Sequence, residues 1–543
     1  MNQNLANGAP ELSAALAAGA NVARVRPGPE GPGLIYGRNV IHDHEDPWGE
    51  AQGWIDHATG GQADQKPALA LIFGLGLGYH LELLRRAYPG IRFLVFEPTP
   101  ELINIYELHK VFAGAQPPTV VSEWRDYEEL ISQELVYSGK QGVIMLASPG
   151  YMALAPEVFK AFAQFSSQEV LRHSVIEKTR EDLNSVFLGN LAQNAAEVLV
   201  LPDLMVLKGR LPARPAFIVG AGPSLDQNAE FLREVGPRGL VLAASTALKP
   251  LLAKGISPDV VLVLEPSDTS SFLNLSPAEL EILGPKCILA LASSCHPNHF
   301  KVKGFLQAVF HLSAGVAQTF GQGTVLPQGG NVGSAAFALA YAWGLGPLVL
   351  VAQDQAYSGG RLHAKEAPGQ VAEKNGGDIS VAGVGGSTVE THSGLLASLS
   401  WFAESARIIA ATQSPPRLFN CSAEGARIPG FTEASLKDIV TALPAVKGQL
   451  DLPGVLPRIP LANKKEALGD IHQLAGLVSA FRRLSRMDPK KVRAELDEAA
   501  RISPLLAQVL LEARKAEDKA GLIAALDQAD GLMSTMLSSL QRP

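Results

Sequence analysis

The chain has 543 residues, a length at which one hydrophobic core stops growing and two to four domains are expected. Hydrophobic residues make up 47% of the chain and charged residues 18%, which excludes an intrinsically disordered protein. The formal net charge of −7 argues against nucleic acid or an anionic membrane as the main partner.

The first 30 residues are rich in Ala and Gly and end in "RVRPGPEGPG". They lack the charged start and long apolar run of a signal peptide. No uncharged apolar run along the chain approaches the roughly 18 residues that a membrane span needs. Three cysteines form no disulfide framework. We therefore expect a cytoplasmic protein without a membrane span.

The segment 68–108 reads as a strand, a glycine turn, a helix, a strand and a helix, and 141–154 adds another buried strand. This pattern predicts an N-terminal Rossmann-like α/β domain over 30–200. "FGLGLGYH" carries Gly74, Gly76 and Gly78, and Glu97 ends the next strand.

This spacing of glycines and acid is the pattern of nucleotide binding, and it also resembles the first two motifs of S-adenosylmethionine methyltransferases. The alternative is a tight turn without a ligand, and no later catalytic motif supports a cofactor. Whether the loop from Gly74 to Gly78 binds a ligand stays open.

A second series of apolar strands begins near residue 214 with "PAFIVGAG" and continues through "GLVLAAST", "DVVLVLEP", "CILALASS" and "PLVLVAQD". Helix-like segments separate these strands, which predicts a doubly wound parallel sheet in a central domain over 205–450. Ligands of such sheets bind at the carboxyl ends of the strands. From 460 to 543 the periodicity predicts a helical C-terminal domain.

The stretch "FIVGAGPSLD", residues 217–226, marks the first strand of the central sheet. Gly220 and Gly222 would let backbone amides approach a ligand, and Ser224 with Gln227 forms a capping-box pattern. A helix starting there would attract an anion, most simply a phosphate. The motif is no Walker loop, because no Gly-Lys-Ser/Thr follows, and Leu225 replaces the third glycine of a dinucleotide fingerprint.

The motifs GAGPSLD, a Gly-Ile-x-Pro-Asp turn, GGNVGSAA, QDQAYSGGRLHA and NCSAEGARIPG follow one another in this order. Together they resemble the motility-associated factor (Maf) glycosyltransferases, whose MptE-like central domain is shared with archaeal 6-hydroxymethylpterin diphosphokinases. "FGLGLGYHLELL…VFEP" is similar to the Maf N-terminal domain. The resemblance covers roughly 65–440 and implies a sialyltransferase-like central domain.

The resemblance implies a CMP-sugar-dependent protein O-glycosyltransferase that moves a nonulosonic acid, of the pseudaminic or legionaminic type, to Ser or Thr hydroxyls of flagellin. Such an enzyme supports flagellum assembly and motility. It implies catalytic roles for Asp354, Tyr357, His363 and His392. Histidine is suited to take the acceptor's proton because its pKa lies near neutrality. The choice between His363 and His392 as base stays open.

We expect the donor to contact the glycine loop and the polar ends of the neighbouring strands. The residues expected there are Gly220, Gly222, Pro223, Ser224, Leu225, Ser245, Thr246, Glu265, Asn331, Gly333, Ser334 and Asn420. No tightly bound cofactor and no metal are expected, since "CHPNH" at 295–299 lacks a second ligand pair.

Three other functions stay open at this point. The first is a pterin or nucleotide diphosphokinase, and the second is a non-catalytic flagellin-binding accessory protein. The third is a methyltransferase that uses the loop at 74–97. The nonulosonic acid, the modified residues of flagellin and the oligomeric state are not determined by the sequence.

Overall fold

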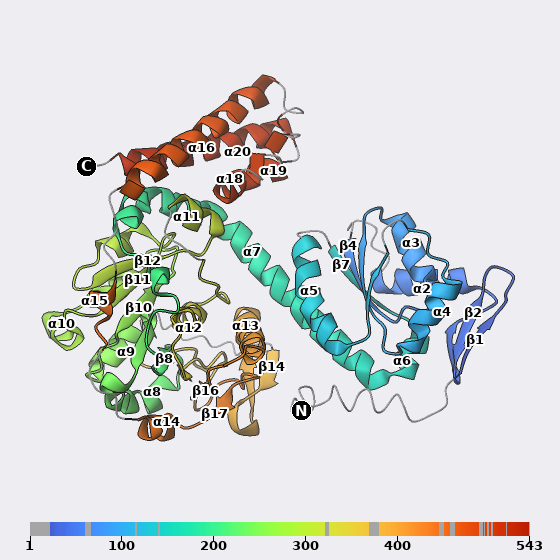
Figure 1. Cartoon of the computed structure of the whole chain (residues 1–543), viewed down its shortest axis with the longest axis horizontal. Coiled ribbons are helices and arrows are strands. Elements are labelled where there is room, and N and C mark those ends of the chain that lie inside the picture. Colours follow the sequence, from blue (N-terminus) through green and yellow to red (C-terminus); the bar gives the residue numbers. More distant parts are fainter. Residues whose placement is uncertain are drawn as a thin grey trace. The chain divides into compact units, whose positions relative to one another are not determined.

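The computed structural model describes most of the chain. The described residues are 22–59, 67–114, 117–138, 142–320, 325–368, 379–444, 450–456, 462–487, 492, 495–496, 499–500, 503–516 and 518–541. Contacts divide the chain into two compact units, residues 1–178 and 179–543 (Figure 1). The predicted division into three domains stays a prediction.

The first unit contains an antiparallel meander followed by a parallel α/β sheet with strand order β6-β5-β4-β7. The parallel strands are short and mostly apolar. The two inner ones, β4 and β5, are largely buried, whereas the edge strands β6 and β7 are mostly half-buried. The elements are β1 (Ala23–Arg26), β2 (Gly33–Tyr36), β3 (Asn39–His42), α2 (Pro47–Thr59), β4 (Pro67–Phe73), α3 (Tyr79–Ala87), β5 (Arg92–Phe96), α4 (Glu101–His109), β6 (Thr119–Val121), α5 (Trp124–Ser138), β7 (Gly142–Ala147), α6 (Pro149–Leu154) and α7 (Pro156–Val200), which continues into the second unit.

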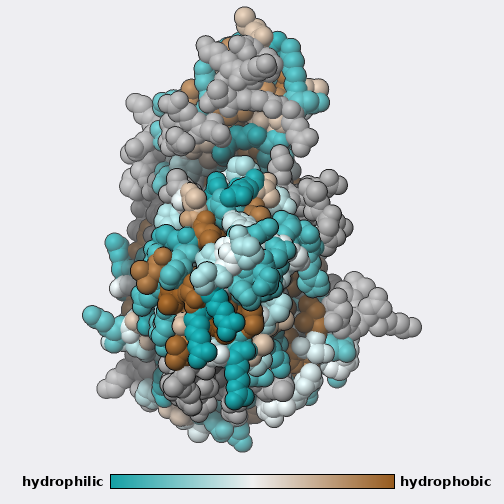
Figure 2. Space-filling model, turned by 90° about the vertical axis from the view of Figure 1, so that its right-hand side faces the viewer, coloured by the Kyte–Doolittle hydropathy of each residue, from teal (hydrophilic) through white to brown (hydrophobic). Residues whose placement is uncertain are grey.

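The surface of the first unit is mixed in character. Figure 2 shows hydrophilic and apolar residues interspersed on the face turned to the reader. The exposed large apolar residues include Leu108 and Val40. Single exposed apolar side chains are ordinary on a folded surface, so they indicate no particular partner.

The second unit is built on an eight-stranded sheet, order β12-β11-β10-β9-β8-β13-β16-β17, in which every described pair is parallel. Its strands are β8 (Ala216–Val219), β9 (Leu240–Ala244), β10 (Val260–Val263), β11 (Ile288–Ala292), β12 (Leu306–Phe310), β13 (Leu348–Val351), β16 (Leu418–Asn420) and β17 (Thr432–Glu433). A separate antiparallel pair joins β14 (Ile379–Ala382) to β15 (Thr388–Thr391).

Helices connect these strands and cover both faces of the sheet. Along β8, Ile218 belongs to one apolar cluster, whereas Phe217 and Val219 belong to another, so alternate side chains enter cores on opposite faces. The helices are α8 (Leu225–Asn228), α9 (Leu248–Ala253), α10 (Pro277–Leu283), α11 (Ala314–Thr319), α12 (Val332–Ala342), α13 (Ser393–Ala410), α14 (Leu436–Ala442) and α15 (Leu452–Val455).

Short 3-10 helices lie between several of these elements: Leu204–Leu207, Ala229–Glu234, Gly236–Arg238, Ser245–Ala247, Ser270–Leu273, Pro297–Lys301 and Val384–Gly386. The predicted α/β fold class, with a Rossmann-like first part and a doubly wound central sheet, is confirmed.

The C-terminal part is helical, as predicted. Its helices are α16 (Ala462–Met487), α18 (Pro504–Val509), α19 (Leu511–Lys515) and α20 (Lys519–Leu540). Their apolar faces share a core with the end of α7, where Leu191 and Val198 are buried. The helices therefore pack within the second unit instead of forming a separate contact group.

Candidate functional site

The strand order of the second unit reverses between β8 and β13. From β8 the chain proceeds through β9 to β12 on one side, and β13 then pairs with the other side of β8. Ligands of open α/β sheets bind outside the carboxyl ends of the strands at such a switch point. The loops that begin at Gly220 and Ala352 lie there, and they contain most of the predicted catalytic motif.

The two glycines after β8 allow close contact between these two loops. The amide of Gly220 donates to the carbonyl of Val351 at 2.9 Å, and that of Gly222 donates to the carbonyl of Ala352 at 3.1 Å. A Cβ added to Gly222 would lie 2.6 Å from Oδ2 of Asp354, closer than carbon and oxygen can approach. The glycines thus admit a neighbouring loop, which differs from the expectation that they admit a ligand.

Ser224 joins a third loop to the first two. Its amide donates to Oδ2 of Asp354 at 2.8 Å, and its hydroxyl oxygen accepts from the amides of Ala423 at 2.9 Å and Glu424 at 3.3 Å. The predicted capping box is therefore wrong, because the Ser224 side chain caps no helix amide and the Gln227 amide group donates to Glu424.

At the predicted helix N-terminus the α-helix is one turn long, since α8 covers Leu225–Asn228, and a 3-10 helix, Ala229–Glu234, follows it directly. The amide of Leu225 donates to the carbonyl of Gly222 at 3.0 Å. The amides of Gly220, Gly222, Ser224 and Leu225 thus have protein acceptors, which contradicts the expectation of free donors for a phosphate.

Asp226 accounts for the Ser-Leu-Asp ending of the motif. Its carboxylate accepts from Nη1 of Arg361 at 3.0 Å and from the amide of Lys365 at 3.1 Å. The amide of Ala364 donates to the carbonyl of Ala221 at 2.7 Å. The motif therefore holds the loop that follows β13, while Leu225 is fully buried in the core.

Asp354 lies in strained backbone. Ala352 has a φ of 52° and Gln355 a φ of 51°, and among the described residues they are the two non-glycine residues with positive φ. A residue in this conformation costs of order 1–2 kcal/mol, and such strain gathers at functional sites. Asp354 is 3% exposed, and burial raises the pKa of its carboxyl, while the hydrogen bond from Ser224 opposes the rise.

Buried polar atoms without hydrogen-bond partners accumulate in the loops at this edge of the sheet. Such atoms are rare in native proteins, and each costs about 1–3 kcal/mol unless something satisfies it. A polar ligand is one way to satisfy them. Within the described part of the chain these atoms are Ser245 Oγ, Gln353 Nε2, Asp354 Oδ1, Gln355 Oε1 and Ser422 Oγ.

Tyr357 and His392 are brought together by the hairpin of β14 and β15. Their rings are 6.1 Å apart at an interplanar angle of 67°, and the Tyr357 amide donates to the carbonyl of Glu390 at 2.8 Å. His392 precedes α13, and its Nδ1 accepts from the amide of Gly394 at 3.2 Å. His363 is half-buried in the loop that follows Tyr357.

Asn331, Gly333 and Ser334 begin helix α12. Oδ1 of Asn331 accepts from the amide of Ser334 at 2.8 Å, and its Nδ2 donates to Oγ of Ser398 at 2.6 Å. A Cβ on Gly333 would lie 2.2 Å from Oε1 of Gln353. These predicted ligand contacts therefore have clear structural roles, and any contact with a donor stays a prediction.

Asn420 and Glu265 differ in whether their side-chain oxygens already accept hydrogen bonds. Oδ1 of Asn420 accepts from the amide of Ser422 at 3.0 Å and shapes the loop after β16. Glu265 follows β10, is half-buried, and has no hydrogen bond to its carboxylate among the described contacts. Burial raises the pKa of Glu265. Ser245 is buried and Thr246 half-buried after the adjacent strand β9.

In the first unit, side chains of the protein itself occupy the space beside the glycine loop. Glu97 is fully buried and accepts from the amides of Leu75 at 2.8 Å and Thr99 at 2.9 Å, and from the Tyr151 hydroxyl at 2.5 Å. A Cβ on Gly74 would lie 2.3 Å from the Tyr151 ring. This geometry contradicts a ribose contact by Glu97 and favours the structural interpretation of the loop.

The structure describes no group of three or more His, Cys, Asp or Glu side chains placed to hold a metal ion. In "CHPNH", Cys295 is fully buried, and burial raises the pKa of its thiol. Within the described residues, no helix combines the length and the apolar character that crossing a bilayer requires.

Part of the chain around the switch point is similar to a known protein family. Residues 189–360 match the family described as 6-hydroxymethylpterin diphosphokinase MptE-like. The predicted resemblance to MptE-like proteins is thereby confirmed for residues 189–360. This region contains the loop after β8 and the start of the loop after β13, but neither His363, His392 nor Asn420.

One solved structure with a similar chain is that of a MAf glycosyltransferase from Magnetospirillum magneticum AMB-1. The identity is 15% and the TM-score 0.49, and the alignment covers 99% of this chain and 91% of that chain. No curated protein sequence matches this chain.

Proposed function

We propose that the chain is a glycosyltransferase that binds a nucleotide-activated sugar at the switch point between β8 and β13. The observation that carries this proposal is the strained corner at Asp354, where Ala352 and Gln355 have positive φ and one carboxylate oxygen lacks a partner. Backbone strain and unmade hydrogen bonds both reduce stability. Both are typical of ligand-binding sites, where they contribute to function.

The order of the central motifs supports a more specific form of the proposal. The donor is a CMP-activated nonulosonic acid, and the acceptor is a Ser or Thr hydroxyl of flagellin in the cytoplasm. The unpartnered atoms of Ser245, Gln353 and Ser422 offer donors and acceptors for cytosine and ribose. Glu265, with its half-buried carboxylate, is suited to bind sugar hydroxyls.

The chemistry required is transfer away from a phosphate leaving group. Negative charge grows on the phosphate as the glycosidic bond breaks, and hydrogen-bond donors aimed at it lower the barrier. The Tyr357 hydroxyl is one such donor. Because Nδ1 of His392 accepts from Gly394, the neutral ring carries its proton on Nε2 and donates from there. His392 thus suits the phosphate, and His363 is our candidate for the base.

A second function is favoured by one observation, the name of the family that matches residues 189–360. A diphosphokinase would bind a nucleoside triphosphate at the same switch point and transfer a diphosphate to a pterin alcohol. The two proposals differ in the nucleotide that binds and in the product, so ligand binding separates them.

The first test measures the melting temperature of the purified full chain with CMP, ATP or S-adenosylmethionine. A ligand present at 100 times its Kd stabilises the folded state by about 2.7 kcal/mol. We expect CMP to raise the melting temperature and the other two to leave it unchanged. A rise with ATP alone would favour the diphosphokinase instead.

The second test measures the intact mass of flagellin co-expressed with variants of this chain. Tyr357→Phe removes one donor to the phosphate and should reduce transfer by about 10–1,000-fold. The control is Tyr341→Phe, a change in the same unit on a half-exposed side chain of α12. Unchanged transfer by Tyr357→Phe and His363→Ala would favour the non-catalytic accessory protein.

A further inference from the structure

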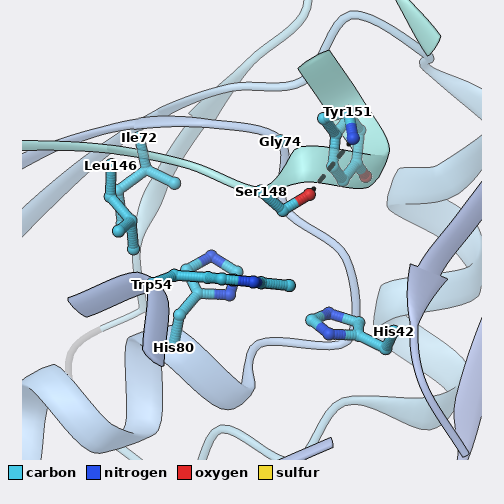
Figure 3. A pocket seen from close by; sticks show the side chains of 8 residues that line it. All are labelled: His42, Trp54, Ile72, Gly74, His80, Leu146, Ser148 and Tyr151. Carbon is cyan, nitrogen blue, oxygen red and sulfur yellow. Dashed lines mark hydrogen bonds between the residues drawn. The ribbon is translucent and has the colours of Figure 1, made fainter. Parts of the chain in front are cut away.

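A narrow pocket lies at the carboxyl end of the first unit's sheet, beside β4 and β7 (Figure 3). β5 and β6 lie on one side of β4 and β7 lies on the other, so the strand order reverses there. Gly74 follows β4, Ser148 follows β7, and both line the pocket. This is the place where open α/β sheets bind ligands. The first unit thus has a switch point of its own.

Two buried histidines face this pocket. His42 is 1% exposed and His80 is 3% exposed, and none of their four ring nitrogens has a hydrogen-bond partner among the described residues. Nδ1 of His42 is 3.7 Å from Oε2 of Glu50, which is longer than a hydrogen bond. Glu50 and the Gly74 backbone lie close enough to raise the pKa of His42 and of His80 respectively, but neither completes a hydrogen bond of normal geometry. Buried polar groups are normally satisfied, so the ring nitrogens remain open to a partner.

Burial keeps both rings uncharged at neutral pH. It lowers the pKa of His80 to about 3, the neighbouring His42 adds to the lowering, and the Gly74 backbone opposes it. Burial also lowers the pKa of His42. A neutral imidazole presents one donor and one acceptor. The Ser148 hydroxyl accepts from the amide of Tyr151 and keeps its own proton to donate.

Trp54 forms the outer wall of the pocket. Its ring stacks on His42 at 5.4 Å with an interplanar angle of 25°, and it lies 6.0 Å from the ring of His80 (Figure 3). Of the side chains that line the pocket, Trp54 is the one that is not buried. The space not filled by atoms is about 190 Å³, part of which is open solvent, and no part of the pocket is wide enough for a free water molecule. Entry therefore requires Trp54 to move.

We propose that the first unit binds a small, uncharged nitrogen heterocycle beside His42 and His80, in the space that Trp54 vacates when it moves. A planar ring can take the place of the Trp54 ring against His42, and its alternating donors and acceptors match those of two neutral imidazoles and a hydroxyl. A charged ligand fits poorly, because the pocket lining carries no opposite charge. This site is separate from the one proposed at β8 and β13, and it does not depend on that proposal.

The probes are adenine and nicotinamide, added separately to the full chain and followed by saturation-transfer NMR and by the melting temperature. We expect at least one probe to bind, with a rise of about 5 °C at a hundredfold excess over its Kd. His80→Phe fills the pocket with an apolar ring and should abolish binding. The matched control is His109→Phe, an exposed histidine in the same unit, which should bind as the wild type does.

Two outcomes would overturn the proposal. One is that neither probe binds the wild type, and the other is that His80→Phe binds as well as His109→Phe. Binding that is lost in Asp354→Asn but kept in His80→Phe would place the probe in the second unit, again against the proposal. If His80→Phe does not fold, the ring nitrogens of the wild-type histidines are followed by ¹⁵N NMR. Their resonances must shift on probe addition, and unchanged resonances reject the site.

Discussion

Asp354 connects the two loops at the second unit's switch point through one carboxylate oxygen. Oδ2 accepts from the Ser224 amide, and Oδ1 completes no hydrogen bond of normal geometry, although the Ser422 side chain lies near enough to lower the pKa of the carboxyl. The side chain therefore has one firm structural contact and one oxygen that a ligand can engage. Such a division lets a single residue hold the corner and still bind a substrate, and the two roles can be separated by mutation.

We predict that Asp354→Ala lowers the free energy of unfolding by about 1–3 kcal/mol, because it leaves the buried Ser224 amide without an acceptor. Asp354→Asn keeps an acceptor oxygen and should lose less stability, yet reduce glycan transfer. Urea denaturation and intact-mass analysis of flagellin measure the two effects. The control Asp438→Asn alters an exposed carboxylate and should change neither. Equal stability of Asp354→Ala and the wild type would contradict this account.

Glu97 gives the first unit a pH dependence of known sign. Burial raises its pKa from 4.5 to about 7, while the bonds from Tyr151, Leu75 and Thr99 oppose the rise. At this group the folded state therefore binds more protons than the unfolded state between these values, so the contribution of Glu97 to stability falls as the pH rises from about 4.5 to about 7.

We predict that Glu97→Gln makes this decline shallower, as measured by urea denaturation at pH 4.5, 5.5, 6.5 and 7.5. Other buried groups contribute in this range. The raised pKa of Asp203, about 7, in the second unit has the same sign as Glu97, whereas the lowered pKa of His80, about 3, in the first unit has the opposite sign, so the test compares the slope of the variant with that of the wild type. An unchanged slope in Glu97→Gln would show that Glu97 does not titrate in this range in the folded protein.

At the scale of elements, the glycine corner depends on how closely β8 and β13 approach. Gly222 has room for a hydrogen atom but not for a methyl group against Asp354. We predict that Gly222→Ala lowers the free energy of unfolding by about 1–3 kcal/mol through overpacking. Gly469→Ala, in the exposed part of α16 with open space around it, should instead raise it by about 0.5–1 kcal/mol. Destabilisation of both variants alike would reject the steric explanation.

The positions of the strands and the parallel character of the sheet could be predicted from the sequence. Runs such as "VVLV" and "LVLV" are continuously apolar, as strands buried on both faces must be. The helical C-terminal part followed from its periodicity. The MptE-like character of the centre followed from the order of several motifs.

The contacts of the glycine loop were not accessible in this way. Nothing in "GAGPSLD" reveals that Asp354, some 130 residues further on, supplies the acceptor for Ser224. The capping-box pattern was misleading for the same reason, because the Ser224 hydroxyl binds distant amides of the loop after β16. A local sequence pattern cannot identify a hydrogen-bond partner that is distant in the sequence and becomes a neighbour only in the folded protein.

The buried histidines of the first unit were missed by the sequence analysis. His42 and His80 lie 38 residues apart in unrelated local contexts, and no motif joins them. The signal appears only when the meander and α3 are packed together, so that both rings face one pocket.

At the scale of the whole molecule, the two units separate the two proposed sites. Every residue proposed for transfer lies between Gly220 and Ser422, within the second unit. We predict that a chain of residues 179–543, which retains the end of α7, shows the same rise in melting temperature with CMP as the full chain. A chain of residues 1–178 should show none. Loss of the CMP response in 179–543, despite a folded circular dichroism spectrum, would mean that the first unit contributes to the site.

The satisfied amides of the glycine corner have a kinetic consequence. A nucleotide that binds the Ser224 amide must compete with the carboxylate of Asp354, which already accepts from that amide. Because the fold holds this carboxylate in place, its effective concentration far exceeds that of any metabolite. The loops after β8 and β13 must therefore part before the nucleotide can engage this amide. In a stopped-flow experiment the observed rate would then level off at high nucleotide concentration, and the plateau would report how often the free protein opens.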